Sequence, residues 1–103
     1  DYIHIMDLSE AHVTALEYVN KNTGLNFFNI GTGKGVSVLE LIKTFEKVSG
    51  FRIPIKISNR RKGDCAVCFA DPKKANDTLY WKSKRDVYQM CESAWKFAIN
   101  NRI

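Results

Sequence analysis

The residues best suited to chemistry form a short basic loop at positions 59–64, directly after an apolar run. Arg60, Arg61 and Lys62 are followed there by one glycine and by Asp64. Arginine presents a planar fork of donors that suits phosphate oxygens, and lysine adds a point charge. An ionised aspartate only accepts hydrogen bonds, so it suits hydroxyl groups such as a ribose diol. The loop therefore favours a nucleotide diphosphate over a nucleic-acid backbone, with a solvated charged turn as the alternative.

Composition limits the classes of protein that can be considered. The chain has 103 residues and 45% hydrophobic residues, which predicts one soluble globular unit with a modest core. Its net charge of +5 permits an anionic ligand, but aromatic residues do not alternate with the basic ones as in single-strand nucleic-acid binders. No apolar run approaches the roughly 18 residues that span a membrane. The odd set Cys65, Cys68 and Cys91 favours a reduced, cytoplasmic protein.

Two helices and a strand are expected in the first half of the chain. The run from Asp7 to Glu10 resembles a capping box and starts a helix that ends before Gly24. Residues 27–30 are aromatic and follow a glycine, so they are expected to form a buried strand. Ser37 and Glu40 form a second capping box, and the helix that follows ends at Gly50.

The second half of the chain is expected to begin with a strand at residues 52–57, before the basic loop. A short helix starts at Pro72, and Ser83 is expected to cap a last helix. The predicted fold class is therefore α/β, with two short strands packed against about four helices. The predicted core consists of Phe28, Ile30, Leu39, Ile42, Phe45, Ile55, Trp81 and Trp95.

Several patterns imitate functional motifs. The glycines of residues 31–35 lack the G-x-G-x-x-G spacing and the later acidic residue of a dinucleotide loop, so we interpret them as a tight turn that lines another group's site. Tyr80 and Lys84 match a Tyr-x-x-x-Lys catalytic pair, but a cap at Ser83 would place Tyr80 before the helix. The pair of cysteines at 65 and 68 lacks a second ligand pair for zinc, and both histidines are interpreted as structural or surface residues.

Five segments occur in an order typical of a known family. They are DYIHIMDLSEAH at 1–12, FNIGTGKGVSV at 28–38, RRKGD at 60–64, ADPKKA at 70–75 and WK at 81–82. This series resembles the UDP-hexose 4-epimerases of the extended short-chain dehydrogenase/reductase family. The likeness covers the whole chain, which corresponds to roughly the last third of such an enzyme. It implies that residues 1–103 form a C-terminal UDP-sugar-binding domain, the remainder of a two-domain protein being an N-terminal Rossmann domain.

The resemblance also implies roles for four residues. The position of Arg61 binds the UDP diphosphate in this family, and that of Asp64 binds the ribose. The position of Val38 borders the uridine pocket. The position of Cys68 lies beside the hexose, where a small side chain leaves room for an N-acetylated sugar.

The implied activity belongs to the whole enzyme. UDP-glucose and UDP-galactose are interconverted in galactose metabolism through a 4-keto intermediate, with NAD held by the N-terminal domain of a homodimer. No catalytic or metal-binding residue is expected in this chain, which should be inactive alone and bind neither nucleic acid nor a membrane. The alternatives are a related nucleotide-sugar dehydratase or decarboxylase, and a freestanding anion- or RNA-binding module.

Overall fold

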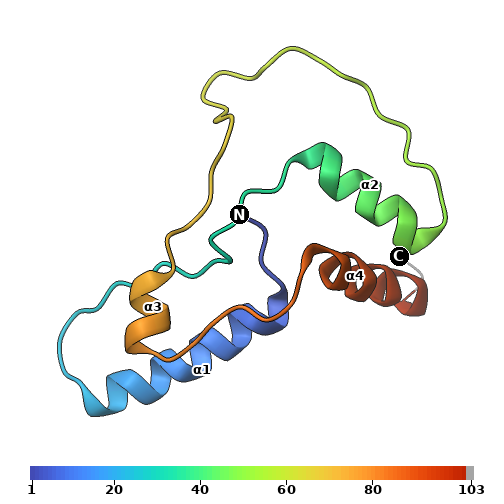
Figure 1. The fold of residues 1–103 in the computed structure, drawn as a ribbon. Helices are drawn as coiled ribbons and strands as arrows, with labels where there is room; N and C mark the ends of the chain where they lie inside the picture. Colours follow the sequence, from blue (N-terminus) through green and yellow to red (C-terminus); the bar gives the residue numbers. More distant parts are fainter. Residues whose placement is uncertain (102–103) are drawn as a thin grey trace.

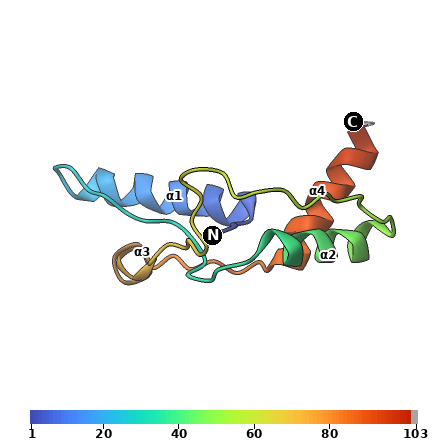
Figure 2. The same ribbon diagram turned by 90° about the horizontal axis from the view of Figure 1, so that it is seen from above.

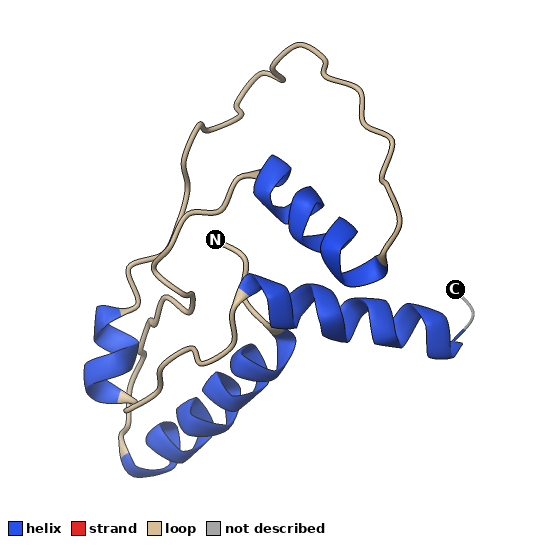
Figure 3. Ribbon diagram, turned by 45° about the vertical axis from the view of Figure 1, so that its right-hand side comes forward, coloured by secondary structure: helices blue, strands red, loops and turns tan. Residues whose placement is uncertain are grey.

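Helices account for all the regular structure in residues 1–101, the part of the chain that the computed structural model describes. In order they are α1 (Ile5–Lys21), α2 (Val38–Ser49), α3 (Lys73–Thr78) and α4 (Val87–Asn101). α1 and α3 lie at one end of the molecule, whereas α2 and α4 lie at the other (Figure 1). Long loops connect the two ends, and the longest is an arch from α2 to α3 that contains the basic loop (Figure 3).

A small core holds α1 against α3 and the segment that follows it. Ala11, Ala75, Leu79 and Trp81 are its buried members, with relative exposures of 6% or less. The two alanines carry side chains small enough for the elements to approach closely. Partly buried residues surround them, and the rings of Tyr18 and Phe28 meet edge to face at 5.6 Å. These contacts define the first packing unit.

A second packing unit is formed by α2 against α4. Its centre is Trp95, whose ring lies 6.0 Å from that of Phe45 and 5.8 Å from that of Phe51. No residue of α2 is fully buried. One side of this unit therefore stays open to solvent.

The two predicted strands are wrong for the described part of the chain. Residues 27–30 and 52–57 run as loops without regular secondary structure. A strand requires a neighbouring strand to accept and donate its backbone hydrogen bonds, and neither segment has one beside it. In Figure 2, residues 27–30 instead run along α1.

Only part of the predicted core is buried. Trp81 is confirmed, with 4% of its surface exposed. Leu39 and Ile55 are exposed at 50% and 54%, because nothing in the described chain covers their side of α2 and of the arch. The remaining predicted core residues are half-buried, namely Phe28, Ile30, Ile42, Phe45 and Trp95.

Local signals at the two ends of α2 are confirmed. The Ser37 side chain accepts from the Glu40 N–H at 3.1 Å, and the Glu40 carboxylate accepts from the Ser37 N–H at 2.7 Å. These hydrogen bonds satisfy N–H groups that the first turn of a helix leaves free. Gly50 ends the helix in the left-handed region at φ 75°, a conformation that favours glycine.

The predicted starts of α1 and α4 are wrong. α1 begins at Ile5, where the Nδ1 atom of His4 accepts from the Met6 N–H at 3.0 Å, so Asp7 lies inside the first turn. α4 begins at Val87 rather than after Ser83. Asp86 and Gln89 exchange side-chain and backbone hydrogen bonds of 2.9 Å in a capping box of their own. Within residues 1–101, no helix combines the length and the apolar character needed to traverse a bilayer.

Candidate functional site

An open hollow of about 420 Å³ lies between the start of α2 and the end of the arch. It brings together Val38 and Cys68, two predicted site residues that are thirty positions apart in the sequence. Tyr2 and Cys65 also contribute to its lining. Val38 is 61% exposed and Cys68 is exposed, so both side chains are accessible to a ligand.

The carboxylate of Asp1 joins the segments on the two sides of this hollow by hydrogen bonds. It accepts from the Thr32 hydroxyl at 2.8 Å and from the backbone N–H groups of Thr32, Gly33 and Ala70 at 3.1 Å. A Cβ atom at Gly31 would lie 2.6 Å from the Asp1 Oδ2 atom and 2.7 Å from the Ala70 Cβ atom. Glycine is therefore required at position 31 for the close approach of three segments.

The basic loop closes as a tight turn that joins Arg61 to Asp64. The Asp64 Oδ2 atom accepts from the Arg61 backbone N–H at 3.2 Å and from the Arg61 Nε atom at 3.1 Å. The Asp64 N–H donates in return to the Arg61 carbonyl oxygen at 3.2 Å. Gly63 supports the turn with a φ of 89°. The turn holds a cation and an anion side by side at an exposed position.

This pairing leaves a hydrogen-bonding group available on each of the two residues. Arg61 uses its Nε atom, so within residues 1–101 the two terminal nitrogens of its fork have no partner. Asp64 uses Oδ2 in the same contacts, which leaves Oδ1 as an acceptor. Arg61 and Asp64 do not line the hollow, but Asp64 directly precedes Cys65, which does. The predicted site residues thus form two neighbouring groups.

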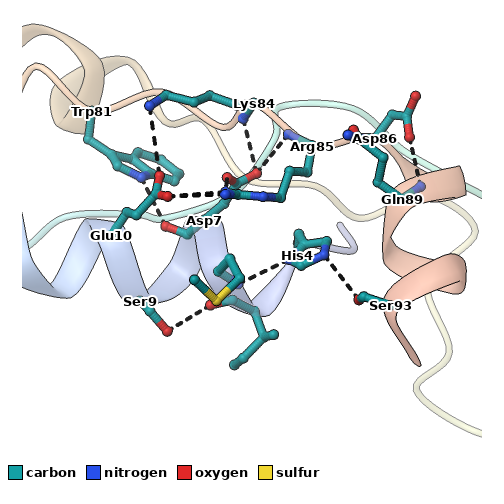
Figure 4. Close-up of polar contacts among 12 residues, drawn as sticks. His4, Asp7, Ser9, Glu10, Trp81, Lys84, Arg85, Asp86, Gln89 and Ser93 are labelled. Carbon is teal, nitrogen blue, oxygen red and sulfur yellow. Dashed lines mark hydrogen bonds and ion pairs between the residues drawn. The ribbon is translucent and has the colours of Figure 1, made fainter. Parts of the chain in front are cut away.

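A polar network that the sequence interpretation missed joins α1 to the segment before α4 (Figure 4). The Asp7 carboxylate, fully buried, accepts from the guanidinium of Arg85 and from the backbone N–H groups of Lys84 and Arg85. Burial raises the pKa of Asp7, but these hydrogen bonds and the guanidinium charge outweigh burial, so its pKa lies below the ordinary value. Arg85 also donates to Glu10 at 3.2 Å.

The same network includes the indole of Trp81, which donates to the Asp7 carbonyl oxygen at 2.9 Å. Its members are buried or occupied by one another. The network therefore stabilises the fold, because it ties α1 to the segment before α4. The sequence signal that could have revealed Asp7 is its position on the side of α1 that also carries the buried Ala11.

Other candidate residues have structural environments. Tyr80 lies outside any helix, is 90% exposed and has a φ of 52°, so it does not share a helix face with Lys84. His4 is buried, and its Nε2 atom lies 3.1 Å from the Ser93 hydroxyl, which links α1 to α4. The Nδ1 atom of His12 lies 2.8 Å from the Leu8 carbonyl oxygen on exposed α1 surface. In residues 1–101 no group of three acidic, histidine or cysteine side chains is placed to hold a metal ion.

No protein-family profile matches the chain, but individual proteins do. It is 52% identical over 101 residues to UDP-glucose 4-epimerase of Bacillus subtilis and 44% identical over 101 residues to that of Neisseria meningitidis. Each match covers 98% of this chain and 30% of the relative. The chain therefore spans about 30% of the length of these curated relatives.

Solved structures show the same likeness in three dimensions. UDP-glucose 4-epimerase from Bifidobacterium longum, in complex with NAD+ and UDP, superposes with a TM-score of 0.91 at 41% identity. The match covers 99% of this chain and 30% of that structure. The epimerase from Stenotrophomonas maltophila, with bound NAD and formylated UDP-arabinopyranose, gives 0.88 at 43% identity and covers 100% of this chain and 31% of that structure.

Proposed function

From its likeness to one stretch of UDP-glucose 4-epimerases along its whole length, we propose that this chain is the UDP-sugar-binding part of such an enzyme. The whole enzyme would interconvert UDP-glucose and UDP-galactose. The chain would supply contacts to the nucleotide and to the hexose. The observation that carries the proposal is a 52% identity that extends over 98% of the chain.

The Arg61–Asp64 turn is the proposed nucleotide contact. The free fork of Arg61 suits two oxygens of a diphosphate, and the free Oδ1 atom of Asp64 suits a ribose hydroxyl. Their exposed ion pair favours one direction of the guanidinium before a ligand arrives. Such preorganisation reduces the entropic cost of binding.

The hollow beside the turn is the proposed site for the uridine and the hexose. Val38 would contact the uridine, and Cys68 would lie beside the sugar. The small thiol of Cys68 lies at the edge of this hollow of roughly 420 Å³. We therefore include the N-acetylated pair of UDP-hexosamines among the substrates that the site would accept.

NAD fits poorly on the residues of this chain. The backbone N–H groups of Thr32 and Gly33, which a dinucleotide phosphate would need, already donate to the Asp1 carboxylate. An anion cannot share these donors without displacing that carboxylate. The cofactor would accordingly be held by the rest of the parent enzyme, and no step through it is assigned to these residues.

A chimeric enzyme tests the proposal. This chain would replace the matching 101 residues of the Bacillus subtilis epimerase, and conversion of UDP-galactose to UDP-glucose would be measured. We expect turnover within about tenfold of the Bacillus enzyme, a barrier difference of about 1.4 kcal/mol or less. UDP-N-acetylgalactosamine as a second substrate tests the role of Cys68. A soluble chimera that binds NAD but turns over no UDP-hexose would overturn the proposal.

A further inference from the structure

We propose that Asp1 is a positioning residue, which holds the two sides of the hollow at the separation that a UDP-sugar needs. One side is residues 32–38, which end at Val38, and the other is residues 65–70, which include Cys68. This role rests on the proposed function, because it takes the hollow to be the site for the uridine and the hexose.

The Asp1 carboxylate lines the hollow, but its oxygens are occupied by the protein itself. They accept from the hydroxyl and the N–H of Thr32 and from the N–H groups of Gly33 and Ala70. An ionised carboxylate offers about four lone-pair sites, which these donors fill. A sugar hydroxyl could bind to Asp1 only by displacing one of them. The carboxylate therefore acts on a ligand through the residues that it holds.

Asp1 holds the side that contains Cys68 directly. Its main-chain nitrogen donates to the Cys68 carbonyl oxygen at 2.7 Å, and its carboxylate accepts from the Ala70 N–H at 3.1 Å. These contacts lie on either side of Phe69, so Cys68 cannot move away from Asp1 without breaking at least one of them. Inside a longer chain the same nitrogen is a peptide N–H, which can donate to the same oxygen. The contact is therefore available in the parent enzyme as well.

Hydrogen bonds between the two sides all run through Asp1 in the described residues 1–101. The Gly33 N–H donates to the carboxylate at 3.1 Å from the first side. The two sides otherwise meet by packing, since a Cβ atom at Gly35 would lie 3.4 Å from the Phe69 ring. Apolar contact has no preferred direction, so it allows the two sides to slide. Loss of the carboxylate should therefore leave them without a fixed separation.

Kinetics of the chimera with the Bacillus epimerase test this role. In Asp1→Ala we expect the KM for UDP-galactose to rise about tenfold and kcat to change by about twofold or less, because binding is weakened more than chemistry. A loss of folded enzyme would instead lower kcat and leave KM unchanged. The matched control is Asp71→Ala, the same change at a carboxylate whose one hydrogen bond among the described residues comes from the nearby Lys73 N–H.

Asp1→Asn is the conservative variant. Its amide oxygen can still accept from the N–H groups of Gly33 and Ala70, but its amide nitrogen cannot accept from the N–H of Thr32. We therefore expect partial rescue, with a KM for UDP-galactose that is about threefold above that of the unsubstituted chimera. The affinity for NAD should be the same in all these proteins, because the cofactor would be held outside this chain.

Hydrogen exchange of the same proteins measures the contact apart from activity. The amides of Gly33 and Ala70 should exchange about tenfold faster in Asp1→Ala than in the unsubstituted chimera, because they lose their acceptor.

An unchanged KM in Asp1→Ala, or an equal rise in Asp71→Ala, would overturn the positioning role. An unsubstituted chimera that folds but turns over no UDP-hexose would count against the proposed function instead. Hydrogen exchange then decides the positioning role alone, and faster exchange at Gly33 and Ala70 in Asp1→Ala would support it. Unchanged exchange would overturn it in either case.

Discussion

Arg61 and Asp64 form an ion pair, so a change at one would also alter the nucleotide contact proposed for the other. In the proposed parent enzyme, Arg61→Ala should weaken UDP-sugar binding by about ten- to a hundredfold, since hydrogen bonds to charged groups contribute about 1.5–3 kcal/mol. Arg61→Lys should restore binding only in part, because a point charge lacks the fork. Steady-state kinetics should place most of the loss in KM, since the diphosphate is remote from the reacting carbon. If Arg60→Ala is equally damaging, the loop acts as a diffuse positive patch.

Asp7 links the stability of the fold to pH. Its pKa is lowered in the folded chain, so its stabilising contribution is present above the unfolded value of 3.8 and is lost as the pH falls through the folded value. Asp7→Asn should remove this dependence and lower the free energy of unfolding by about 2–3 kcal/mol, because Arg85 loses its buried counter-charge.

Urea unfolding of the chain between pH 2 and pH 7 measures both effects of the Asp7 variant. The control is Asp77→Asn, which makes the same chemical change at an exposed position of α3. It should alter stability by no more than about 0.5 kcal/mol. A variant at Asp7 that retains the acid sensitivity of the original chain would show that other carboxylates cause it.

At the scale of elements, a helix start that depends on neighbouring residues carries its signal in the sequence, but two such signals can compete for one start, and a start fixed by a distant partner carries none. The Ser37–Glu40 box was correctly identified because both partners lie within one turn. The Asp86–Gln89 box has the same local form, and it was overlooked in favour of Ser83. Asp7 looked like a cap because its partner, Arg85, lies 78 positions away in the sequence and only the fold brings them together.

The capping residues give a direct test of this reading of the helix starts. Ser37→Ala and Asp86→Ala should each lower the free energy of unfolding by about 1 kcal/mol, because each removes an acceptor for free N–H groups of the first turn. Ser83→Ala should have little effect. Chemical unfolding of the three variants decides the matter, and a larger loss for Ser83→Ala than for Asp86→Ala would restore the predicted start of α4.

The strands could not be located reliably for a different reason. The alternation of residues 27–30 is a true local signal, but pairing requires a second strand that the described chain does not contain. For the site residues, too, the sequence predicts one part of the arrangement and only the fold reveals the other. The resemblance to a family predicts Val38 and Cys68 as site residues, and the fold places both on one hollow. The Arg61–Asp64 ion pair was not predicted, because a charged loop permits many turn geometries.

At the scale of the whole molecule, the proposed ligand site is open on one side. The hollow and the Arg61–Asp64 turn are exposed to solvent, so the chain alone would bury little of a nucleotide sugar. We expect a dissociation constant for UDP well above 1 μM, since binding must also offset the loss of ligand freedom. Isothermal titration calorimetry measures it. A submicromolar constant for the isolated chain would show that these residues form a complete site.

The two packing units each contain one tryptophan, and this makes them optically distinguishable. The indole of Trp81 is shielded from water and hydrogen-bonded to α1, whereas that of Trp95 is half-exposed between Phe45 and Phe51. Fluorescence from Trp95→Phe therefore reports the α1–α3 unit, and fluorescence from Trp81→Phe reports the α2–α4 unit. The units are joined by loops and by the His4–Ser93 contact, and separate parts of one structure can open at different free energies. The fluorescence of the two variants would then change at different denaturant concentrations. Comparison of the two transitions gives the order in which the packing units unfold.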